Sequence, residues 1–429
     1  MAYSTNQLRN AYTQADIKQP TFMELPPGIN FPNMTKESHC LKILKNIYGG
    51  KESGKVWFEH LKTVLTTTMK YTQSKFDECI FFKDLTIFFI YTDDGIFVDP
   101  DPKTVSRRIH ELSTVFEIEN QGNLQEYLGI KIVQAKEGLM TMSQPHLINS
   151  ILKDLNLVDE SMAPRKGVKL KNLPSLTSRQ IGPDTDGAPL DAPWHYQSVI
   201  GKLNFLEKST RPDISFVVHQ LARFVTNPKQ SHGHAIKHLA RYLLGTRDKG
   251  IVFNPNPPLS LTCHVDADFA GNWNHKEAPN NTDTARSRSG FIVFFAGAPL
   301  FWQSKLQTVI SLSTAESELI ALSEASRFVK SMMYLIDELN DRGIEASSLP
   351  EVYCNIFEDN AAALEISKVP KVRPRTRHIN VLYHHFRAEV QNNRVKIHPI
   401  KTDENLADVL TKQQAASLFM RHRKEILGW

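Results

Sequence analysis

The sequence predicts a mixed α/β protein built from an α+β N-terminal part, a helical middle part and a C-terminal α/β part. Between residues 41 and 155, helical and β-forming segments follow the order helix–strand–strand–helix–strand, which is typical of an α+β unit rather than of a doubly wound sheet. A helical block begins at Tyr196 and runs to about residue 252. From residue 259, strands are followed by a long helix, one more strand and late helices.

The chain of 429 residues is long enough for two or three domains, and 41% hydrophobic with 23% charged residues is ordinary for a folded, soluble protein. No apolar run approaches the ~20 residues of a membrane span, and the N-terminus lacks a secretion signal. We therefore expect an intracellular protein without a membrane partner. The net charge of +5 permits nucleic-acid binding without establishing it, and the oligomeric state stays open.

The four cysteines lie far apart in the sequence, and no two of them form a C-x-x-C pair. This spacing argues against a zinc module and against a disulfide framework. Local patterns predict the elements of the N-terminal part: a helix over 54–70, strands over 78–84 and 85–100, a helix over 101–118, a hairpin over 124–145 and a helix over 145–157.

A change of composition marks the domain boundaries. Residues 158–195 are rich in Pro, Gly, Asp and Ser and have no hydrophobic period, so they are expected to form a linker. The predicted parts are therefore 1–157, the linker 158–195, the helical segment 196–252, the α/β domain 259–415 and a C-terminal tail 416–429.

Two adjacent carboxylates, Asp93 and Asp94, stand between two strongly β-forming runs in the stretch LTIFFIYTDDGIFVDP. Asp-Asp-Gly is good hairpin chemistry, because Asp and Gly tolerate the backbone angles of a tight turn. A tip placed between buried strands could equally let divalent metals bridge the carboxylates to a phosphate. Both interpretations are open from these residues alone.

Four further acids are spread over the C-terminal part. Asp266 lies on the polar face of the alternating strand LSLTCHVDADFAG, where an acid is usually just solvated. Glu318 differs, because on the helix after residue 313 it falls on the apolar stripe of Leu322, Ala325 and Val329. An acid on an inward stripe needs a reason, and a metal ion would supply one.

The other two acids have simple structural alternatives. Asp359 ends a strand and could act as the N-cap of the following helix. Asp408 lies in a late helix, where an exposed acid is common. Each of the four is weak evidence for a metal site when it is taken singly.

The motifs nevertheless occur in a recognisable order. Five stretches resemble, in order and spacing, the reverse transcriptases of copia-type LTR retrotransposons. They are MELPPGI (23–29), LKILKNIYGGKESGKVWFEHL (41–61), YTDDGIFV (91–98), NLQEYLGIKI (123–132) and YQSVIGKLNFLEKSTRPDISF (196–216). The resemblance extends from about residue 10 to residue 415. It implies a partial α+β reverse-transcriptase palm, a helical thumb or connection segment, and an α/β RNase H-like domain with a mixed five-stranded sheet.

Asp93 and Asp94 are then implied to be metal-binding carboxylates of the polymerase palm, acting on a template-primer. The family's third palm aspartate falls at Gln7 in this sequence, and Glu52 stands where the family usually has Gln. The family's upstream fingers segment is also not included, so the resemblance implies a truncated reverse transcriptase. A carboxylate at Glu52 would repel a triphosphate, and we expect DNA polymerisation to be impaired or lost.

The resemblance implies a second metal site in DADFAG, TAESELIAL, EDNAAALEI and NLADVLTK. Its catalytic carboxylates would be Asp266, Glu318, Asp359 and Asp408. Acids of this kind hold two Mg²⁺ or Mn²⁺ ions and cleave the RNA strand of an RNA–DNA hybrid. The residues expected to contact nucleic acid are Arg375, Arg377 and His378. His398 is interpreted as structural in preference to a base for product release. The family implies a location in the cytoplasm, within virus-like particles, or in the nucleus.

Three alternatives stay open. The stretch Gly49 to Lys55 nearly matches a phosphate-binding loop, but Val56 stands where that loop needs Ser or Thr for magnesium. A catalytically dead nucleic-acid-binding relic is favoured by Gln7 and Glu52. An active polymerase would be restored if the chain is one piece of a longer polyprotein.

Overall fold

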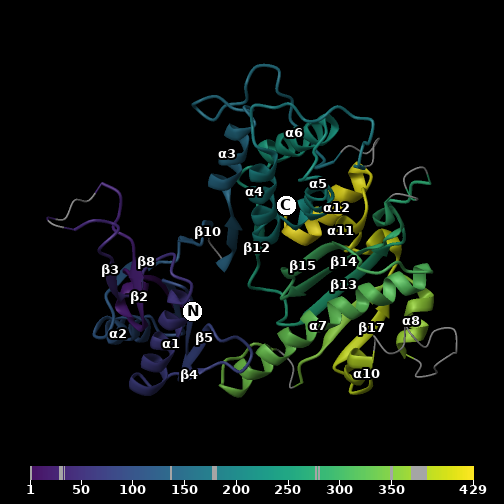
Figure 1. Cartoon of the computed structure of the whole chain (residues 1–429). Helices are drawn as coiled ribbons and strands as arrows, with labels where there is room; N and C mark the ends of the chain where they lie inside the picture. The colour runs from purple at the N-terminus through teal and green to yellow at the C-terminus, as the bar shows by residue number, and fades with distance from the viewer. Residues whose placement is uncertain are drawn as a thin grey trace. The chain divides into compact units, whose positions relative to one another are not determined.

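The computed structural model describes residues 2–28, 32, 34–135, 138–175, 181–275, 278, 281–347, 351–368 and 384–429 (Figure 1). The chain forms two compact units. The N-terminal unit contains residues 1–128 and 338–344, and the C-terminal unit contains residues 129–337 and 345–429. The boundary near residue 128 differs from the predicted boundary at residue 157.

The N-terminal unit is mixed in secondary structure. Its strands are β1 (Ala2–Leu8), β2 (Asp16–Met23), β3 (Leu41–Lys45), β4 (Thr72–Gln73), β5 (Ile80–Lys83), β6 (Thr86–Tyr91), β7 (Asp94–Asp99), β8 (Ile118–Asn123) and β9 (Glu126–Tyr127). Its helices are α1 (Ser53–Thr63), which continues into a π-helical turn over Val64–Thr68, and α2 (Pro102–Ser113). The predicted helices over 54–70 and 101–118 are confirmed with shorter bounds.

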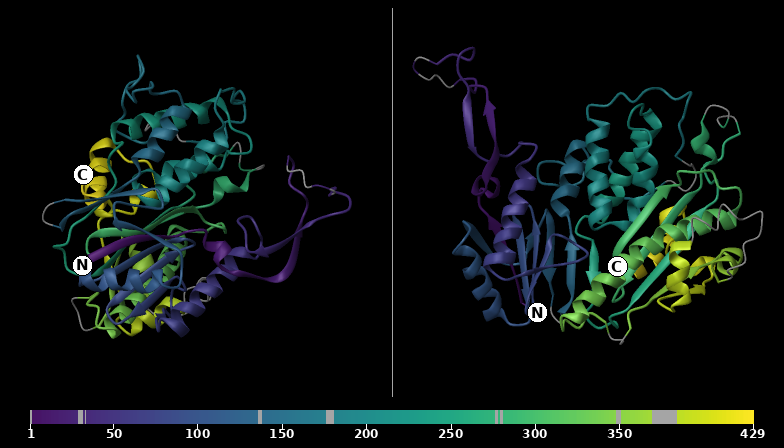
Figure 2. Two further views of the ribbon diagram at one scale, coloured as in Figure 1. Left: turned by 90° about the vertical axis from the view of Figure 1, so that its left-hand side faces the viewer. Right: turned by 60° about the horizontal axis from the view of Figure 1, so that its bottom comes forward.

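Six strands form one sheet in the order β4-β5-β6-β7-β1-β8, and all neighbouring strands in it are antiparallel. Phe81, Phe88 and Phe97 face one another across β5, β6 and β7, and the rings of Phe88 and Phe97 stack at 4.3 Å. The row packs with apolar residues of α1 and α2 in one core, because alternate side chains of a strand share a face. Strands β2 and β3 extend from this sheet as a mostly exposed hairpin, purple in Figure 2.

Helix α2 shows how local sequence sets an element. The side chain of Asp101 accepts hydrogen bonds from the backbone N–H groups of Lys103 and Thr104, and Pro102 occupies the first turn. An acidic N-cap followed by proline satisfies free backbone donors and fixes the entry to the helix, so the helix begins at Pro102.

The C-terminal unit is larger. Its strands are β10 (Ile130–Gln134), β11 (Met140–Ser143), β12 (Ile251–Phe253), β13 (Leu261–Asp268), β14 (Arg288–Phe295), β15 (Ala298–Leu306), β16 (Cys354–Glu358) and β17 (Val395–Pro399). Its helices are α3 (Pro145–Asp154), α4 (Tyr196–Ser209), α5 (Ser215–Ala222), α6 (Gln230–Gly245), α7 (Thr314–Asp341, whose last residues belong to the N-terminal unit), α8 (Ala361–Lys368), α10 (His384–Gln391), α11 (Asp408–Thr411) and α12 (Ala416–Leu427).

Residues 129–157, the helical segment and the α/β part belong to one unit, because strands pair across the predicted linker and the helices share one core with the C-terminal elements. Strand β11 pairs with β12 in antiparallel fashion, with Met140 opposite Phe253. Helices α3 to α6 bury their apolar faces in one core together with α11 and α12. The described residues of the predicted linker, 158–175 and 181–195, contain no helix or strand.

Most of the predicted tail 416–429 instead forms helix α12 (Ala416–Leu427). Its side chains Phe419, Ile426 and Leu427 are buried in the same core as the helical segment. The helix ends at Gly428, whose φ of 85° is the left-handed conformation that commonly closes a helix. The pattern was missed because the stretch is short and rich in basic residues.

The predicted mixed five-stranded sheet is confirmed. Its order is β15-β14-β13-β16-β17; β13 to β15 are antiparallel, and β16 and β17 run parallel to β13. Side chains of β14 alternate between two cores: Phe291 and Val293 pack with α7, and Ile292 and Phe294 pack with the core that contains α11 and α12. Helix α7 runs along the face of the sheet that carries Phe291 and Val293 (Figure 1).

Candidate metal centre

Asp266 is placed by β13, where the predicted alternation holds at buried Leu261, Cys263 and Val265. Although the other face of this strand was expected to be polar and solvated, Asp266 is only 2% exposed. Helix α11 covers it, and the Thr411 hydroxyl donates a hydrogen bond to its carboxylate. The acid is therefore enclosed between a strand and a helix.

A glycine opposite Asp266 permits this close approach of α11. Gly290 pairs with Asp266 across β13 and β14. A Cβ atom at Gly290 would lie 2.5 Å from Thr411 Cγ2 and 3.0 Å from Leu410 Cβ. Because neither distance leaves room for a methyl group, only glycine lets α11 lie this close to the sheet.

Asp359 follows β16 directly. Strands β13 and β16 are parallel, with His264 opposite Phe357. Two residues further along both strands, the same register brings Asp266 and Asp359 side by side. Residues at the carboxyl ends of adjacent parallel strands meet at one edge of the sheet, so the register explains their proximity.

Glu318 lies on the inward stripe of α7, as predicted. Leu322, Ala325 and Val329 are fully buried, and Glu318 is 5% exposed. Its Oε2 atom is buried and has no hydrogen-bond partner. Two residues earlier, Glu316 caps the start of the helix: its carboxylate accepts the backbone N–H of Leu312 at 2.7 Å, and Ser313 Oγ accepts the Glu316 backbone N–H at 3.2 Å.

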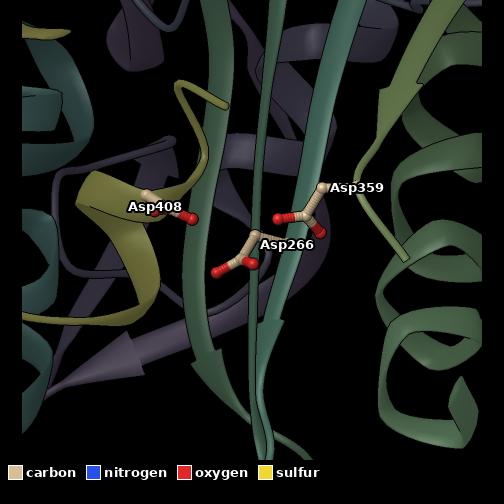
Figure 3. A group of neighbouring side chains, drawn as sticks. All are labelled: Asp266, Asp359 and Asp408. Atoms are coloured by element: carbon tan, nitrogen blue, oxygen red, sulfur yellow. The ribbon is translucent and has the colours of Figure 1, made fainter. Parts of the chain in front are cut away.

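Asp408 is the first residue of α11 and is 2% exposed. Ligand atoms of Asp266, Asp359 and Asp408 all lie within 4.8 Å of one another. Figure 3 shows these three carboxylates approaching one another from β13, from the end of β16 and from α11. Acids spread over residues 266 to 408 are thus brought together by the fold.

The fourth predicted acid, Glu318, belongs to an adjoining group of acids. Ligand atoms of Glu318, Glu358 and Asp359 lie within 4.8 Å of one another, so Asp359 is common to both groups. Glu358 was not predicted. It is the last residue of β16 and is fully buried; one oxygen accepts the backbone N–H of Asn360 at 3.0 Å, and Oε2 has no partner.

Lys412, the residue that follows α11, was also missed, although its spacing of four residues from Asp408 was visible in the sequence. Its Nζ atom lies 2.9 Å from Asp408 Oδ1 and 3.6 Å from Asp266 Oδ1. The side chain of Lys412 is 37% exposed, whereas those of both aspartates are 3% exposed. One ammonium therefore partly neutralises the first acid group.

The proton affinities follow from burial and from the neighbouring charges. Burial raises the pKa of Asp266, and burial together with Asp266 raises the pKa of Asp408. Burial and the Glu358 carboxylate raise the pKa of Glu318, while burial raises that of Glu358. Burial would lower the pKa of Lys412, but Asp266 and Asp408 outweigh it and the pKa is raised.

The chemistry of this donor set fits a hard divalent cation. The two groups contain carboxylate oxygens only, which are the ligands that Mg²⁺ and Mn²⁺ accept. Buried carboxylate oxygens without a donor are costly, by roughly 1–3 kcal/mol or more for a charged group. The unpartnered oxygens of Glu318 and Glu358 therefore suit positions that a cation would satisfy.

In the N-terminal unit, the other predicted carboxylates flank a tight hairpin. The two-residue turn consists of Thr92 and Asp93, because Tyr91 already pairs with Asp94 across β6 and β7. The prediction that Asp93, Asp94 and Gly95 form the turn is therefore wrong by one residue. Trp57 Nε1 donates to the Thr92 carbonyl at 2.7 Å, and this contact helps to hold the turn while Thr92 takes a φ of 57°.

Gln7 lies directly opposite Asp94 in the antiparallel pair of β1 and β7. Its amide oxygen accepts a hydrogen bond of 3.4 Å from Gln121. Burial, followed by the charge of Asp93, raises the pKa of Asp94. The position next to the acidic hairpin thus carries a neutral amide.

The remaining predicted residues have mixed outcomes. Arg375, Arg377 and His378 lie outside the described residues. His398 lies on β17, and its Nε2 atom is 3.0 Å from Asn355 Oδ1, a contact that agrees with a structural role.

Val56 is buried in the core of the N-terminal unit, which leaves the phosphate-binding-loop alternative without a magnesium ligand there. Glu52 is exposed beside the start of α1.

The chain is similar to reverse transcriptases and to retrotransposon polyproteins. Residues 5–165 match the family described as reverse transcriptase (RNA-dependent DNA polymerase). The chain is 30% identical over 432 residues to the retrovirus-related Pol polyprotein from transposon TNT 1-94 of Nicotiana tabacum, covering 98% of this chain and 30% of that protein. For the Pol polyprotein from transposon RE1 of Arabidopsis thaliana, the identity is 28% over 428 residues, covering 98% and 27%.

The chain therefore matches copia-type retrotransposon Pol polyproteins over 98% of its length, with residues 5–165 in their reverse-transcriptase part, as its motifs predicted. It spans less than a third of the length of these two relatives. Among solved structures, LC11-RNase H1 isolated from compost aligns with 15% identity and a TM-score of 0.25, covering 35% of this chain and 92% of that one. Among the described residues, no helix is long and apolar enough to cross a bilayer.

Proposed function

We propose that the C-terminal unit is a metal-dependent ribonuclease that cleaves the RNA strand of RNA–DNA hybrids. The observation that carries this proposal is the convergence of Asp266, Glu318, Asp359 and Asp408 from four separate elements into two adjoining acid groups. Acids spread over about 140 residues have no structural reason to be buried together unless they share a ligand.

Each of these residues has a defined task in the proposal. Asp266, Asp359 and Asp408 would hold one divalent cation, and Glu318 would contribute beside Asp359. When bound, Mg²⁺ or Mn²⁺ supplies a nucleophilic water at neutral pH and charge stabilisation for the leaving 3′ oxygen. Thr411 fixes one oxygen of Asp266, and Lys412 holds Asp408 and Asp266 in place. The products would carry 3′-hydroxyl and 5′-phosphate ends.

The substrate would be recognised by its backbone. Phosphate contacts and the RNA 2′-hydroxyl distinguish a hybrid without reading its sequence. We assign phosphate contact to Arg375, Arg377 and His378 as a prediction from the family motif. An intracellular site of action, in the cytoplasm or the nucleus, follows from the retrotransposon family and is part of the same proposal.

The test uses the purified chain, a hybrid whose RNA strand carries an end label, and either MgCl₂ or EDTA. We expect cleavage by the wild-type chain only with Mg²⁺, and at least a ~10²-fold lower rate for Asp266→Asn. The Asp268→Asn chain is the matched control, since Asp268 lies on the same strand outside both acid groups and should cleave like the wild type. Equal cleavage by Asp266→Asn and the wild type, or none by the wild type, would contradict the proposal.

A second proposal concerns the polymerase site of the N-terminal unit. We infer that DNA synthesis is impaired because Gln7, which faces Asp94, offers an amide where the resemblance requires a third carboxylate. An amide oxygen carries no net charge and would hold a divalent cation less tightly than a carboxylate. Primer extension on an RNA template should give no product from this chain, whereas efficient extension would refute the inference.

A further inference from the structure

The buried side chain of Glu358 has no function in the four-acid site just described. It ends β16, immediately before Asp359, and it is fully buried. Its first oxygen accepts the backbone N–H of Asn360, which a shorter polar side chain could also do. Its second oxygen, Oε2, is buried without a hydrogen-bond partner, so the capping contact alone does not explain a glutamate here.

The surroundings of Oε2 are acidic. Ligand atoms of Glu358, Glu318 and Asp359 lie within 4.8 Å of one another. Glu318 Oε2 is likewise buried without a partner. Within the described part of the chain, no basic side chain comes within 4.0 Å of the carboxylate of Glu318 or Glu358, because the Lys412 ammonium pairs with the other acid group.

We propose that Glu358 is a fifth metal-binding carboxylate, which with Glu318 and Asp359 forms a second cation position. This position adjoins the one bounded by Asp266, Asp359 and Asp408, and Asp359 belongs to both. The inference rests on the proposed nuclease site and assigns its two cations to separate sets of residues. Two unpartnered buried oxygens, on Glu318 and Glu358, point to a ligand that is a cation and not an anion.

The charges agree with two divalent ions. Five ionised carboxylates and one ammonium, that of Lys412, give a formal charge of −4, which two divalent cations bring to zero. Without Glu358 the same count would be −3, and two divalent cations would leave an excess positive charge. Carboxylate count is one of the features that set the affinity of a site for hard cations, so Glu358 should strengthen binding at the second position.

The experiment is a titration of the full chain with MnCl₂, in which electron paramagnetic resonance measures the free ion. We expect two Mn²⁺ ions per wild-type chain. The Glu358→Gln chain should keep one and bind the other roughly 10–100-fold more weakly, the range typical for loss of a group that supports a metal. The Asp268→Asn chain, which removes a carboxylate from the same sheet outside both groups, should bind as the wild type does.

The variant is expected to fold, because a neutral amide of the same shape replaces a buried carboxylate; its thermal midpoint in EDTA should equal or exceed that of the wild type. If it does not fold, Glu318→Gln removes a carboxylate from the same group and should weaken the same ion. Unchanged binding of both ions by a folded Glu358→Gln chain, or fewer than two ions bound by the wild type, would overturn the inference.

Hybrid cleavage separates this inference from the proposed function. Cleavage by a wild-type chain whose Mn²⁺ binding is insensitive to Glu358→Gln would reject the fifth ligand and leave the nuclease standing. A chain that binds two ions, loses one in Glu358→Gln and cleaves no hybrid would support the second cation position and reject the nuclease.

Discussion

Replacement of Lys412 by methionine should destabilise the C-terminal unit in the absence of divalent metal and much less in its presence. The Lys412 ammonium lies 2.9 Å from Asp408 Oδ1 and 3.6 Å from Asp266 Oδ1. At an effective dielectric constant of about 20, the attractions to Asp408 and to Asp266 amount to roughly 5.7 and 4.6 kcal/mol before desolvation is subtracted. Methionine keeps the apolar stem of the side chain and removes only the charge.

The net effect is smaller than the attraction. The lysine side chain is 37% exposed, so solvent screens it and its desolvation offsets part of the gain. Protonation of the buried carboxylates would further reduce the free-energy cost of losing the ammonium. We therefore expect Lys412→Met to lower the free energy of unfolding by about 1–3 kcal/mol in EDTA. A cation bound to Asp266 and Asp408 would take over the role of the ammonium, so saturating MgCl₂ should reduce the loss.

Urea unfolding monitored by tryptophan fluorescence measures this difference. Four of the five tryptophans, Trp194, Trp273, Trp302 and Trp429, belong to the C-terminal unit, so the signal reports mainly on that unit. Lys401→Met is the matched control: Lys401 is 78% exposed and lies 3.8 Å from Glu404, and its loss should change stability by less than ~1 kcal/mol. An equal loss for Lys412→Met in EDTA and in MgCl₂, or no loss in either, would refute the reasoning.

Three further changes test the packing of the C-terminal unit. Arg211→Met should cost about 3–5 kcal/mol, since it leaves the buried carboxylate of Asp213 without its ion-pair partner; urea unfolding measures the loss. Burial lowers the pKa of His422, so the unfolded state takes up the proton first; stability should fall as the pH drops below about 6.5, and His422→Gln should reduce that dependence. Gly290→Ala should displace α11 from contact at Thr411, cost about 1–3 kcal/mol and weaken Mn²⁺ binding.

Each change has a control in the same chain. Arg9→Met breaks an exposed pair with Glu119 and should have little effect, whereas equal effects of the two arginine changes would contradict the first expectation. His39→Gln alters an exposed histidine, and the same pH dependence in both histidine variants would contradict the second. Gly201 lies in α4, and a Cβ atom there would have no other atom within 4 Å, so Gly201→Ala should stabilise the protein by up to ~1 kcal/mol. Similar behaviour of Gly290→Ala would contradict the third expectation.

The sequence predicted those parts of the site that depend on local periodicity. The alternation around Asp266 and the helical phase of Glu318 were both readable, because a strand and a helix repeat at fixed intervals. The predicted five-stranded sheet was implied by the family motifs and is present. The roles of the four acids stay predictions until cleavage is measured.

The features that were missed depend on how elements pack. Glu358 faces Glu318 only because β16 pairs in parallel with β13 and α7 covers that sheet, and neither register nor packing can be read from spacing. The placement of Lys412 beside Asp266 requires α11 to lie against Gly290. The boundary near residue 128 arises from the pairing of β11 with β12, which lie more than a hundred residues apart.

The most direct measurement of the central claim compares three labelled duplexes, namely an RNA–DNA hybrid, an RNA duplex and a DNA duplex, with the wild-type chain and Asp266→Asn in MgCl₂. The proposed site predicts that the wild type cuts only the RNA strand of the hybrid, leaving 3′-hydroxyl and 5′-phosphate ends, and that Asp266→Asn leaves all three intact. Cleavage of the hybrid by Asp266→Asn at the wild-type rate, or an intact hybrid with the wild-type chain, would contradict the assignment of a nuclease to the acids around Asp266.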